Sequence, residues 1–311
     1  MENKILYHLK EVENLIEGKV QYPIACEVDP SNRCQNDCRH CTTHEFRKSF
    51  HGDLDMGIYA LLLDELKDFG TKAIIFTGGG EPLMHPEFEM MVKMAEMKEF
   101  ELGLITNGIL LEKIMDYVEK FKFVRVSLNA TDKQTYKVIH NSNNFEKVVN
   151  NVREIVKRKG STTVGMSYVV FKGMNDFQIG DAKRLAKYLK VDYVQFKPDE
   201  TEDITIEENN DDRVISVNRY NIDSQLPCII AGLVGIVAAD GCIYYCCQCR
   251  DEKFKIGDLR KNSFAELWAT TRNKMKVSCS IKTCRYMNYA EGYKKYRTEI
   301  NNVIMEHKNF L

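Results

Sequence analysis

The sequence lacks a long apolar run, and its charges are close to balanced. No apolar stretch reaches the roughly eighteen residues needed to span a bilayer. The first residues, MENKILYHLKEVENLIEGK, mix charges throughout, so they do not form a signal peptide. A net charge of −1 gives no electrostatic reason to expect nucleic acid or an anionic membrane as the main partner. We therefore expect a cytoplasmic protein without a membrane or nucleic-acid partner.

Cysteine is missing from the middle of the chain and gathers on either side. The 311 residues include 11 cysteines, but none lies between Thr42 and Pro227. One group falls between Cys26 and Cys41, and the other between Cys228 and Cys284. In a reducing compartment, clustered cysteines indicate metal or redox chemistry, whereas a disulfide framework is the alternative interpretation.

Between the two cysteine groups, apolar strands alternate with helical patterns, and no repeat or low-complexity tract interrupts them. We expect strands at 22–30, 72–80, 101–108, 124–130, 162–171 and 191–198. We expect helices at 56–70, 86–100, 111–121, 131–140, 145–159 and 181–190. This α/β order predicts a parallel sheet wound into a partial (βα)6 TIM-like barrel. Ligands on such sheets bind at the carboxyl ends of the strands.

The composition divides the chain into five expected segments. Residues 199–212 are mostly acidic and contain no aromatic residue, which is typical of a solvated linker. A small cysteine-rich α+β domain follows that linker. The expected boundaries are 1–21 for an N-terminal helical extension, 22–198 for the barrel, 199–227 for the linker, 228–290 for the cysteine-rich domain and 291–311 for a C-terminal helix.

The loop after the first strand carries Cys34, Cys38 and Cys41. Three thiolates are one fewer than structural zinc requires, and His40 would have to fold back sharply beside Cys41 to complete such a site. A 4Fe–4S cluster fits better, because each thiolate can bind one of its irons. The fourth iron is then open to an exogenous ligand, which is typical of a reactive site.

This loop, followed by TGGGEP (77–82) after the second strand, resembles the radical S-adenosylmethionine (SAM) superfamily over residues 22–198. The resemblance implies that the amino and carboxylate groups of SAM chelate the open iron. An electron, supplied from outside by a donor such as flavodoxin or ferredoxin, would split the sulfonium C–S bond. The resulting 5′-deoxyadenosyl radical would take a hydrogen atom from an unactivated C–H bond.

Several residues match cofactor-binding positions of that superfamily. Glycines after the second strand let a ligand approach the backbone, and the glutamate that follows them can accept from the ammonium group of SAM, although a plain turn is the alternative. Small polar residues at the next strand ends would contact the ribose and carboxylate, and an imidazole replaces the usual aromatic ring beside adenine. These candidates are Gly78, Gly79, Gly80, Glu81, Thr106, Asn107, Ser127, Asn129 and His40.

The second cysteine group resembles the opening of a SPASM or twitch domain, which carries auxiliary iron–sulfur clusters. The matching pattern is Cys228, twelve residues, Gly241, four residues and Cys246. The Cys-x2-Cys-x5-Cys-x3-Cys run of a full SPASM domain is absent, and only Cys279 and Cys284 follow. The resemblance implies one auxiliary 4Fe–4S cluster, held by Cys228, Cys246, Cys279 and Cys284, with Cys249 as an alternative ligand.

Three cysteines of this group are surplus to that cluster. Cys242 is expected to be buried and unreactive. Because a thiol S–H bond is weak, Cys249, or in second place Cys247, could donate a hydrogen atom to a substrate radical. Each of them could instead be a buried, inert thiol.

The layout resembles radical SAM enzymes of antibiotic biosynthesis that modify aminoglycosides and aminocyclitols. Neomycin C epimerase and 2-deoxy-scyllo-inosamine dehydrogenase represent the two expected outcomes, which are inversion by a thiol donor and oxidation to a ketone through the auxiliary cluster. We expect a carbinol C–H bond of a small carbohydrate, amino sugar or aminocyclitol to react, and the spare cysteines favour inversion. Lys197, Tyr168 and Asp199 are candidate substrate contacts, with solvated or structural roles as the alternative.

Two alternative functions remain open. A maturase of ribosomal peptides is one, because many twitch and SPASM enzymes modify peptides, although we expect no room for a leader-binding domain before Tyr22. A metal-stabilised binding protein is the other, and it predicts colourless zinc protein or clusters without SAM turnover.

Overall fold

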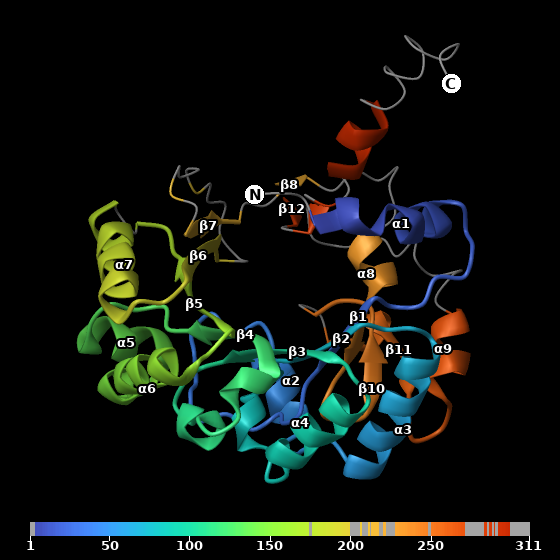
Figure 1. Cartoon of the computed structure of the whole chain (residues 1–311), viewed down its shortest axis with the longest axis horizontal. Coiled ribbons are helices and arrows are strands. Elements are labelled where there is room, and N and C mark those ends of the chain that lie inside the picture. Colours follow the sequence, from blue (N-terminus) through green and yellow to red (C-terminus); the bar gives the residue numbers. More distant parts are fainter. Residues whose placement is uncertain are drawn as a thin grey trace.

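The computed structural model describes residues 4–173, 176–199, 206, 211, 213–217, 220–221, 228–247, 250–270, 283–284, 286–287, 289 and 292–298. Within these ranges, ten strands form one sheet in the order β11-β10-β9-β1-β2-β3-β4-β5-β6-β7 (Figure 1). The first six strands are β1 (Ala25–Val28), β2 (Ala73–Phe76), β3 (Glu101–Thr106), β4 (Phe121–Ser127), β5 (Thr163–Val170) and β6 (Tyr193–Pro198). Neighbours in this series all pair in parallel, which confirms the predicted partial barrel.

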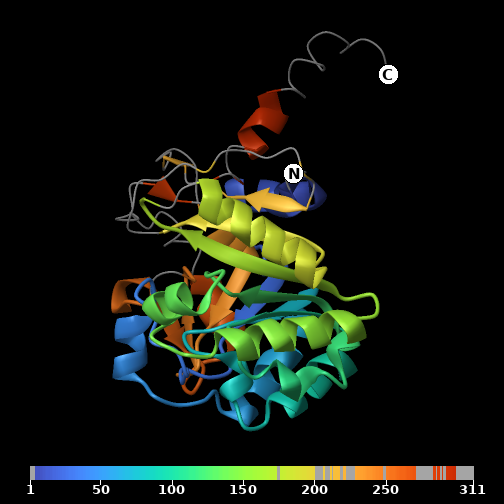
Figure 2. The same ribbon diagram turned by 90° about the vertical axis from the view of Figure 1, so that its left-hand side faces the viewer.

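Helices connect these strands and cover the outer side of the curved sheet, as Figures 1 and 2 show. These helices are α3 (Met56–Asp68), α4 (Phe88–Met97), α5 (Lys133–His140), α6 (Phe145–Arg158) and α7 (Asp176–Leu189). The short helix α2 (His44–Ser49) precedes α3 and has no buried residue. Apolar residues of α6, including Val148, Val152 and Ile155, are buried against the sheet, and charged residues occupy its other face. Every second residue of β1 and β2 is buried in the same core.

The segment predicted as a helix at 111–121 is different in the structure. It forms two 3-10 turns, η3 (Leu111–Ile114) and η4 (Val118–Lys120), before β4 begins. Leu111, Ile114 and Val118 are buried at spacings of three and four residues, and such spacings fit successive 3-10 turns as well as a helix. The prediction was wrong here because periodicity alone does not separate the two.

The predicted linker also contains regular structure. Strand β7 (Val214–Ser216) pairs in parallel with β6, and β8 (Tyr220–Asn221) pairs with β12 (Thr283–Cys284) in a separate two-stranded sheet. Both β7 and β8 lie after the acidic stretch 199–212, in the part of the predicted linker that is not acidic. Most of the remaining residues between 199 and 227 lie outside the described ranges.

The cysteine-rich region extends the barrel sheet on its other side. Its elements are α8 (Ile229–Leu233), β9 (Val234–Val237), β10 (Cys242–Tyr244), η5 (Glu252–Phe254), β11 (Lys255–Asp258) and α9 (Phe264–Thr270). Strand β9 pairs in parallel with β1, with Cys26 opposite Gly235, and β10 and β11 continue as an antiparallel pair. The α+β prediction is confirmed, and the two regions share one continuous sheet.

Helix α9 fixes this region against α3. Glu65 of α3 accepts hydrogen bonds from the backbone N–H groups of Phe264 (3.1 Å) and Ala265 (2.8 Å), which neutralises the amino end of α9. The Trp268 indole donates to the carbonyl of Gln21 (2.9 Å) and stacks on Phe264.

Towards the ends of the chain, η1 (Lys4–His8) and α1 (Leu9–Ile16) pack with α8, and residues 292–298 are helical. Among the residues that the structure describes, no helix combines the length and apolar character that crossing a bilayer demands.

Candidate active site

A cavity of about 270 Å³ opens at the carboxyl ends of the barrel strands. The cysteine loop, the glycine turn, strand ends and the turn after β10 all contribute to its wall. The lining residues considered below are Glu27, Cys34, Cys38, Cys41, His40, Arg47, Gly78, Gly79, Gly80, Glu81, Thr106, Asn107, Arg125, Ser127, Asn129, His140, Lys197, Asp199, Cys247, Arg250 and Tyr286. The structure thus brings both cysteine-bearing regions to one cavity, at the edge where the sequence predicted it.

The cysteine loop is held by the carboxyl end of α5. The backbone N–H groups of Asp37 and Arg39 donate to the carbonyls of His140 (3.0 Å) and Ile139 (3.1 Å). These carbonyls are among the last of the helix, where no intrahelical donor remains for them. Helix α5 therefore fixes the loop between Cys34 and Cys41.

The three loop cysteines are close enough to influence one another. Burial raises the pKa of Cys34 and, more strongly, that of Cys38, and the neighbouring sulfurs of Cys34 and Cys41 raise the Cys38 pKa further. Within the described ranges, no three His, Cys, Asp or Glu side chains surround the position of a single metal ion. A cuboidal cluster places one thiolate on each of three irons, so the convergence of three thiols on one cavity fits it.

His140 is a further residue of the site, and the sequence does not indicate it. Its Nε2 lies 2.9 Å from the carbonyl of Leu128, which only accepts, so Nε2 carries the proton. Nδ1 then accepts, and it lies 3.0 Å from the sulfur of Cys38. Burial lowers the His140 pKa to about 4, so the imidazole is neutral. A histidine at the end of an ordinary amphipathic helix gives no sequence signal for this contact.

The glycine turn packs against the start of the cysteine loop. A Cβ on Gly79 would lie 2.1 Å from Asn32 Oδ1, and a Cβ on Gly80 would lie 2.2 Å from the carbonyl oxygen of Arg33. The N–H of Glu81 donates to that same carbonyl (2.7 Å). These glycines let the start of the cysteine loop dock on the turn, whereas the sequence analysis assigned them to ligand approach.

Glu81 joins the glycine turn to the end of β3. Its Oε1 accepts from the Thr106 hydroxyl (2.6 Å), and Oε2 accepts from the Asn107 N–H (2.7 Å). The side chain is buried, and burial raises its pKa to about 7 although these hydrogen bonds oppose the shift. Thr106 and Asn107 therefore position the carboxylate at the cavity wall, and the Asn107 amide also lies 3.7 Å from Cys34 Sγ.

His40 is oriented by Asn129 at the end of β4. Asn129 adopts a left-handed conformation (φ 54°), which asparagine tolerates. Its Oδ1 accepts from the Val169 N–H (2.9 Å), so its Nδ2 faces His40 Nε2 at 3.3 Å. Burial lowers the His40 pKa to about 4, so the ring is neutral and its proton lies on Nδ1. That ring lines the cavity, as the resemblance to an adenine-packing residue requires.

Two of the three candidate substrate residues line the cavity, and the third does not. Lys197 and Asp199 line the cavity. Ser127, a predicted cofactor contact, also lines it, and its hydroxyl lies 3.4 Å from that of Ser167. Tyr168 is 1% exposed and stacks on Phe196 at a centroid distance of 5.7 Å, outside the cavity lining. We therefore withdraw Tyr168 as a substrate contact, because its side chain is buried in the hydrophobic core.

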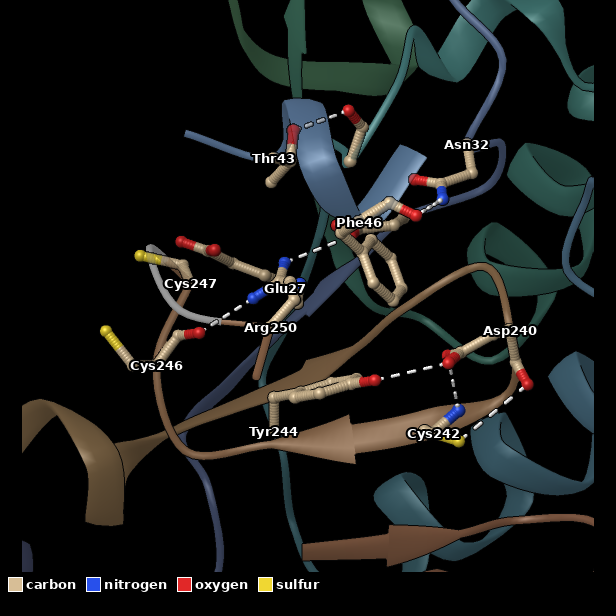
Figure 3. A network of polar contacts seen from close by, with 12 residues as sticks. Glu27, Asn32, Thr43, Phe46, Asp240, Cys242, Tyr244, Cys246, Cys247 and Arg250 are labelled. Carbon is tan, nitrogen blue, oxygen red and sulfur yellow. Dashed lines mark hydrogen bonds and ion pairs between the residues drawn. The ribbon is translucent and has the colours of Figure 1, made fainter. Parts of the chain in front are cut away.

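Arg250 connects the turn after β10 to the barrel (Figure 3). Its guanidinium pairs with Asp29 at 2.9 Å and donates to the carbonyl of Cys246 at 2.7 Å. Both charged side chains are nearly inaccessible, at 4% and 0% exposed. Figure 3 shows this guanidinium against the turn that carries Cys246 and Cys247, with Glu27 of β1 on the same side.

Cys247 is the surplus cysteine that the structure places in the cavity wall. Its sulfur lies 3.0 Å from the hydroxyl of Tyr286, and both residues are half-buried. Cys242 is fully buried in β10, as predicted for an inert thiol. Cys249, the first choice as donor, and Cys279 lie outside the described residues.

Comparison with known proteins identifies the family. The model of the radical SAM superfamily matches residues 28–186, which is half of the chain, and that of the SPASM iron–sulfur cluster-binding domain matches residues 228–291. The protein belongs to the radical SAM superfamily. It also carries a SPASM-type domain.

Its curated relatives are distant. The chain is 30% identical over 123 residues to an S-adenosylmethionine-dependent nucleotide dehydratase of Selenomonas ruminantium, covering 38% of this chain and 44% of that protein. It is 27% identical over 166 residues to a GTP 3′,8-cyclase of Synechocystis, covering 51% and 49% respectively. The chain thus spans at most about half the length of these two relatives.

Solved structures share the fold at low sequence identity. The structure of anSMEcpe with bound AdoMet has a TM-score of 0.65 at 15% identity, covering 93% of this chain and 96% of that one. Streptococcus suis SuiB bound to the precursor peptide SuiA has a TM-score of 0.64 at 14% identity, covering 85% and 69%. These similarities establish the partial barrel with its cysteine-rich extension.

The cofactors follow from the two matched domains. The radical SAM domain uses a 4Fe–4S cluster and SAM, and the SPASM domain uses auxiliary iron–sulfur chemistry. The first site fits such a cluster, because three thiols converge on a cavity that the glycine turn and polar side chains also line. At the second site the structure describes Cys228, Cys246 and Cys284 of the four predicted ligands.

Proposed function

We propose that this protein inverts a carbinol carbon of a small polar substrate, with Cys247 as the hydrogen-atom donor. The observation that carries the proposal is the position of Cys247, whose thiol shares one cavity with the three loop cysteines and the glycine turn. A weak S–H bond in that position can deliver hydrogen to a radical formed there. We propose a carbohydrate, amino sugar or aminocyclitol as the substrate.

The cofactor-binding roles extend the same proposal. Cys34, Cys38 and Cys41 hold the cluster that binds SAM. The auxiliary cluster is held by Cys228, Cys246, Cys279 and Cys284. Glu81 accepts from the ammonium group of SAM, His40 packs along adenine, and Ser127 and Asn129 contact the ribose and carboxylate. When bound, the cluster and SAM supply the 5′-deoxyadenosyl radical that removes hydrogen from the substrate carbon.

The donor step then uses this chain's own residues. The carbon radical takes the hydrogen atom of the Cys247 thiol, so that a C–H bond forms and an S–H bond breaks. Tyr286, whose hydroxyl lies 3.0 Å from the sulfur, holds Cys247 at the cavity wall. The thiyl radical returns to the thiol by taking one electron from an external one-electron donor, such as flavodoxin or ferredoxin, and one proton from solvent.

The charges in the cavity support a polar substrate. Glu27, Arg125, Lys197 and Asp199 line it from β1, β4 and the end of β6, and they include both signs. An apolar substrate would displace water from these groups without replacing the hydrogen bonds that the water makes. A polyhydroxylated or amino-substituted ring can replace those bonds. The relative from Selenomonas is likewise named for a nucleotide, which is a small polar molecule.

Deuterium labelling tests the donor. The reduced, cluster-loaded protein is incubated with SAM in deuterated solvent and with a panel of aminoglycosides, aminocyclitols and short peptides. We expect one solvent deuterium at an inverted carbinol carbon. Cys247→Ala is expected to lose this product and still form 5′-deoxyadenosine, because the thiol acts after hydrogen abstraction. Cys242→Ala, which removes a buried thiol outside the cavity, serves as the matched control.

Other outcomes would assign another function. Unchanged labelled product from Cys247→Ala contradicts the donor role, and loss of label only in Cys249→Ala moves that role to Cys249. A product lighter by two mass units identifies oxidation to a ketone. Modification of peptides alone identifies a maturase, and absence of any SAM turnover favours a metal-stabilised binding protein.

A further inference from the structure

Arg47 places a positive charge beside the first cluster site. It lies on α2, directly after the cysteine loop, and its side chain lines the cavity. Its Nη1 is 3.9 Å from the sulfur of Cys41, and its Nη2 donates to the carbonyl of Asn36 at 3.2 Å. Its Nε is buried without a hydrogen-bond partner among the residues that the structure describes. The guanidinium is therefore anchored at one end and directed towards the thiols.

The charge of Arg47 also reaches the other two loop cysteines. It lowers the pKa of Cys34 and of Cys38, against the larger opposing effect of burial. The groups that contact these sulfurs besides Arg47 are neutral, namely the His140 imidazole, the Thr43 hydroxyl and the Asn107 amide. The carboxylates of Glu81 and Asp37 act in the opposite direction to Arg47, because they raise the pKa of Cys34 and of Cys38 respectively. Arg47 thus supplies a formal positive charge at the three sulfurs.

We propose that Arg47 raises the reduction potential of the cluster held by Cys34, Cys38 and Cys41. Reduction adds one negative charge to a group that already carries three thiolates. A nearby cation stabilises the reduced state more than the oxidised state, and a hydrogen bond to a ligand sulfur acts in the same direction. An arginine suits this position because its guanidinium stays charged when it is partly buried.

This role concerns the electron that splits SAM and is independent of the substrate proposed above. It can be correct with any substrate, and Cys247 can be the donor whatever the potential is. Lys48 provides a matched control on the same helix. It is exposed, and its ammonium group pairs with Glu45 at 2.8 Å, away from the thiols.

The test is a redox titration of the cluster-loaded protein, monitored by electron paramagnetic resonance. The signal that changes on addition of SAM identifies the cluster of the first site, and its potential is measured without SAM. We expect Arg47→Gln to make reduction about tenfold less favourable, which for a one-electron couple is a shift of about 59 mV to more negative potential. Lys48→Gln should leave the potential unchanged, and Arg47→Lys should shift it by less than half as much.

A second readout separates potential from general damage. With flavodoxin as donor, Arg47→Gln should cleave SAM more slowly than the wild type, and a stronger reductant such as titanium(III) citrate should restore the rate. An Arg47→Gln potential equal to that of the wild type would overturn the proposal. If Arg47→Gln holds no SAM-responsive cluster, retention of that cluster in Arg47→Lys supports a role of the charge. Equal loss of the cluster in Arg47→Gln and Arg47→Lys contradicts that role, because the loop then requires the shape of the arginine side chain rather than its charge.

Discussion

At the scale of single residues, the site is governed by buried groups whose charge depends on burial. His40 and His140 are neutral because burial lowers each pKa to about 4, and each ring is held in one tautomer by a defined partner. Glu81 is the opposite case. Burial raises its pKa to about 7, so its charge changes within the physiological range.

If Glu81 accepts from the ammonium group of SAM, as proposed above, SAM binding is expected to depend on pH. The ionised carboxylate attracts an ammonium group, and the raised pKa means that half of the carboxylate is protonated near pH 7 rather than near pH 4.5. We expect the affinity for SAM to be constant above about pH 8 and to fall by up to about tenfold per pH unit below pH 7. Anaerobic calorimetry on the oxidised, cluster-loaded protein measures this, because that protein does not cleave SAM.

Glu81→Gln is the matching variant. Its affinity for SAM should be weaker at pH 8 and should change little between pH 6 and pH 8. A wild-type affinity that is constant over this range would show that Glu81 does not hold the ammonium group.

Some residues of the site could be predicted from local sequence, and others could not. Spacing in the chain predicted that Cys34, Cys38, Cys41 and Glu81 belong to one site, and all four line the same cavity. His140 could not, because its contact with Cys38 joins positions 102 residues apart. Tyr168 was a candidate substrate contact because of its residue type and its position in a strand, but it is buried in the core.

At the scale of elements, the glycine turn and the cysteine loop form one unit. Gly80→Ala would place a Cβ 2.2 Å from the backbone carbonyl oxygen of Arg33. Rotation of a side chain cannot relieve this clash, because the oxygen belongs to the backbone. We expect the loop to shift and the first cluster to be lost, lowering the iron content from about eight to about four per chain. Iron analysis after anaerobic reconstitution measures this loss.

Gly180→Ala is the control for that prediction. Its added Cβ, on α7, would meet only the end of the Arg184 side chain at 3.2 Å, and that side chain can move. The iron content of Gly180→Ala should equal that of the wild type. Full iron loading in Gly80→Ala would contradict the docking of the loop on the turn.

The order of strands and helices was predictable, but their long-range pairing was not. Each βα unit from β1 to β6 has its own apolar period and turn residues, so local patterns located it. The pairing of β9 with β1 joins residues about 200 positions apart, and no local pattern marks Cys26 as the neighbour of Gly235. The 3-10 turns at 111–120 likewise depend on packing rather than on periodicity.

At the scale of the whole molecule, the buried pair of Asp29 and Arg250 joins the barrel to its extension. Removing one member leaves the other charge buried without its partner, which typically costs about 3–5 kcal/mol. Arg250→Met should therefore lower the free energy of unfolding by about that amount, as measured by chemical denaturation of the cluster-free protein. Asp29→Asn combined with Arg250→Met should lose less than Arg250→Met alone, since neither charge then remains buried.

The result that would contradict this account is additive loss in the double variant. Additivity would mean that the two side chains act independently, despite the 2.9 Å that separates them.

The same ion pair has a consequence for the order in which the protein matures. Asp29 leaves the ribosome 221 residues before Arg250, and β1 is made long before β9 can flank it. The aspartate just upstream of Cys34 thus has no counter-ion until most of the polypeptide has been synthesised. Iron delivered to a nascent chain would meet the cysteine loop before Arg250 and β9 are in place beside β1. We therefore expect insertion of the first cluster to follow completion of translation.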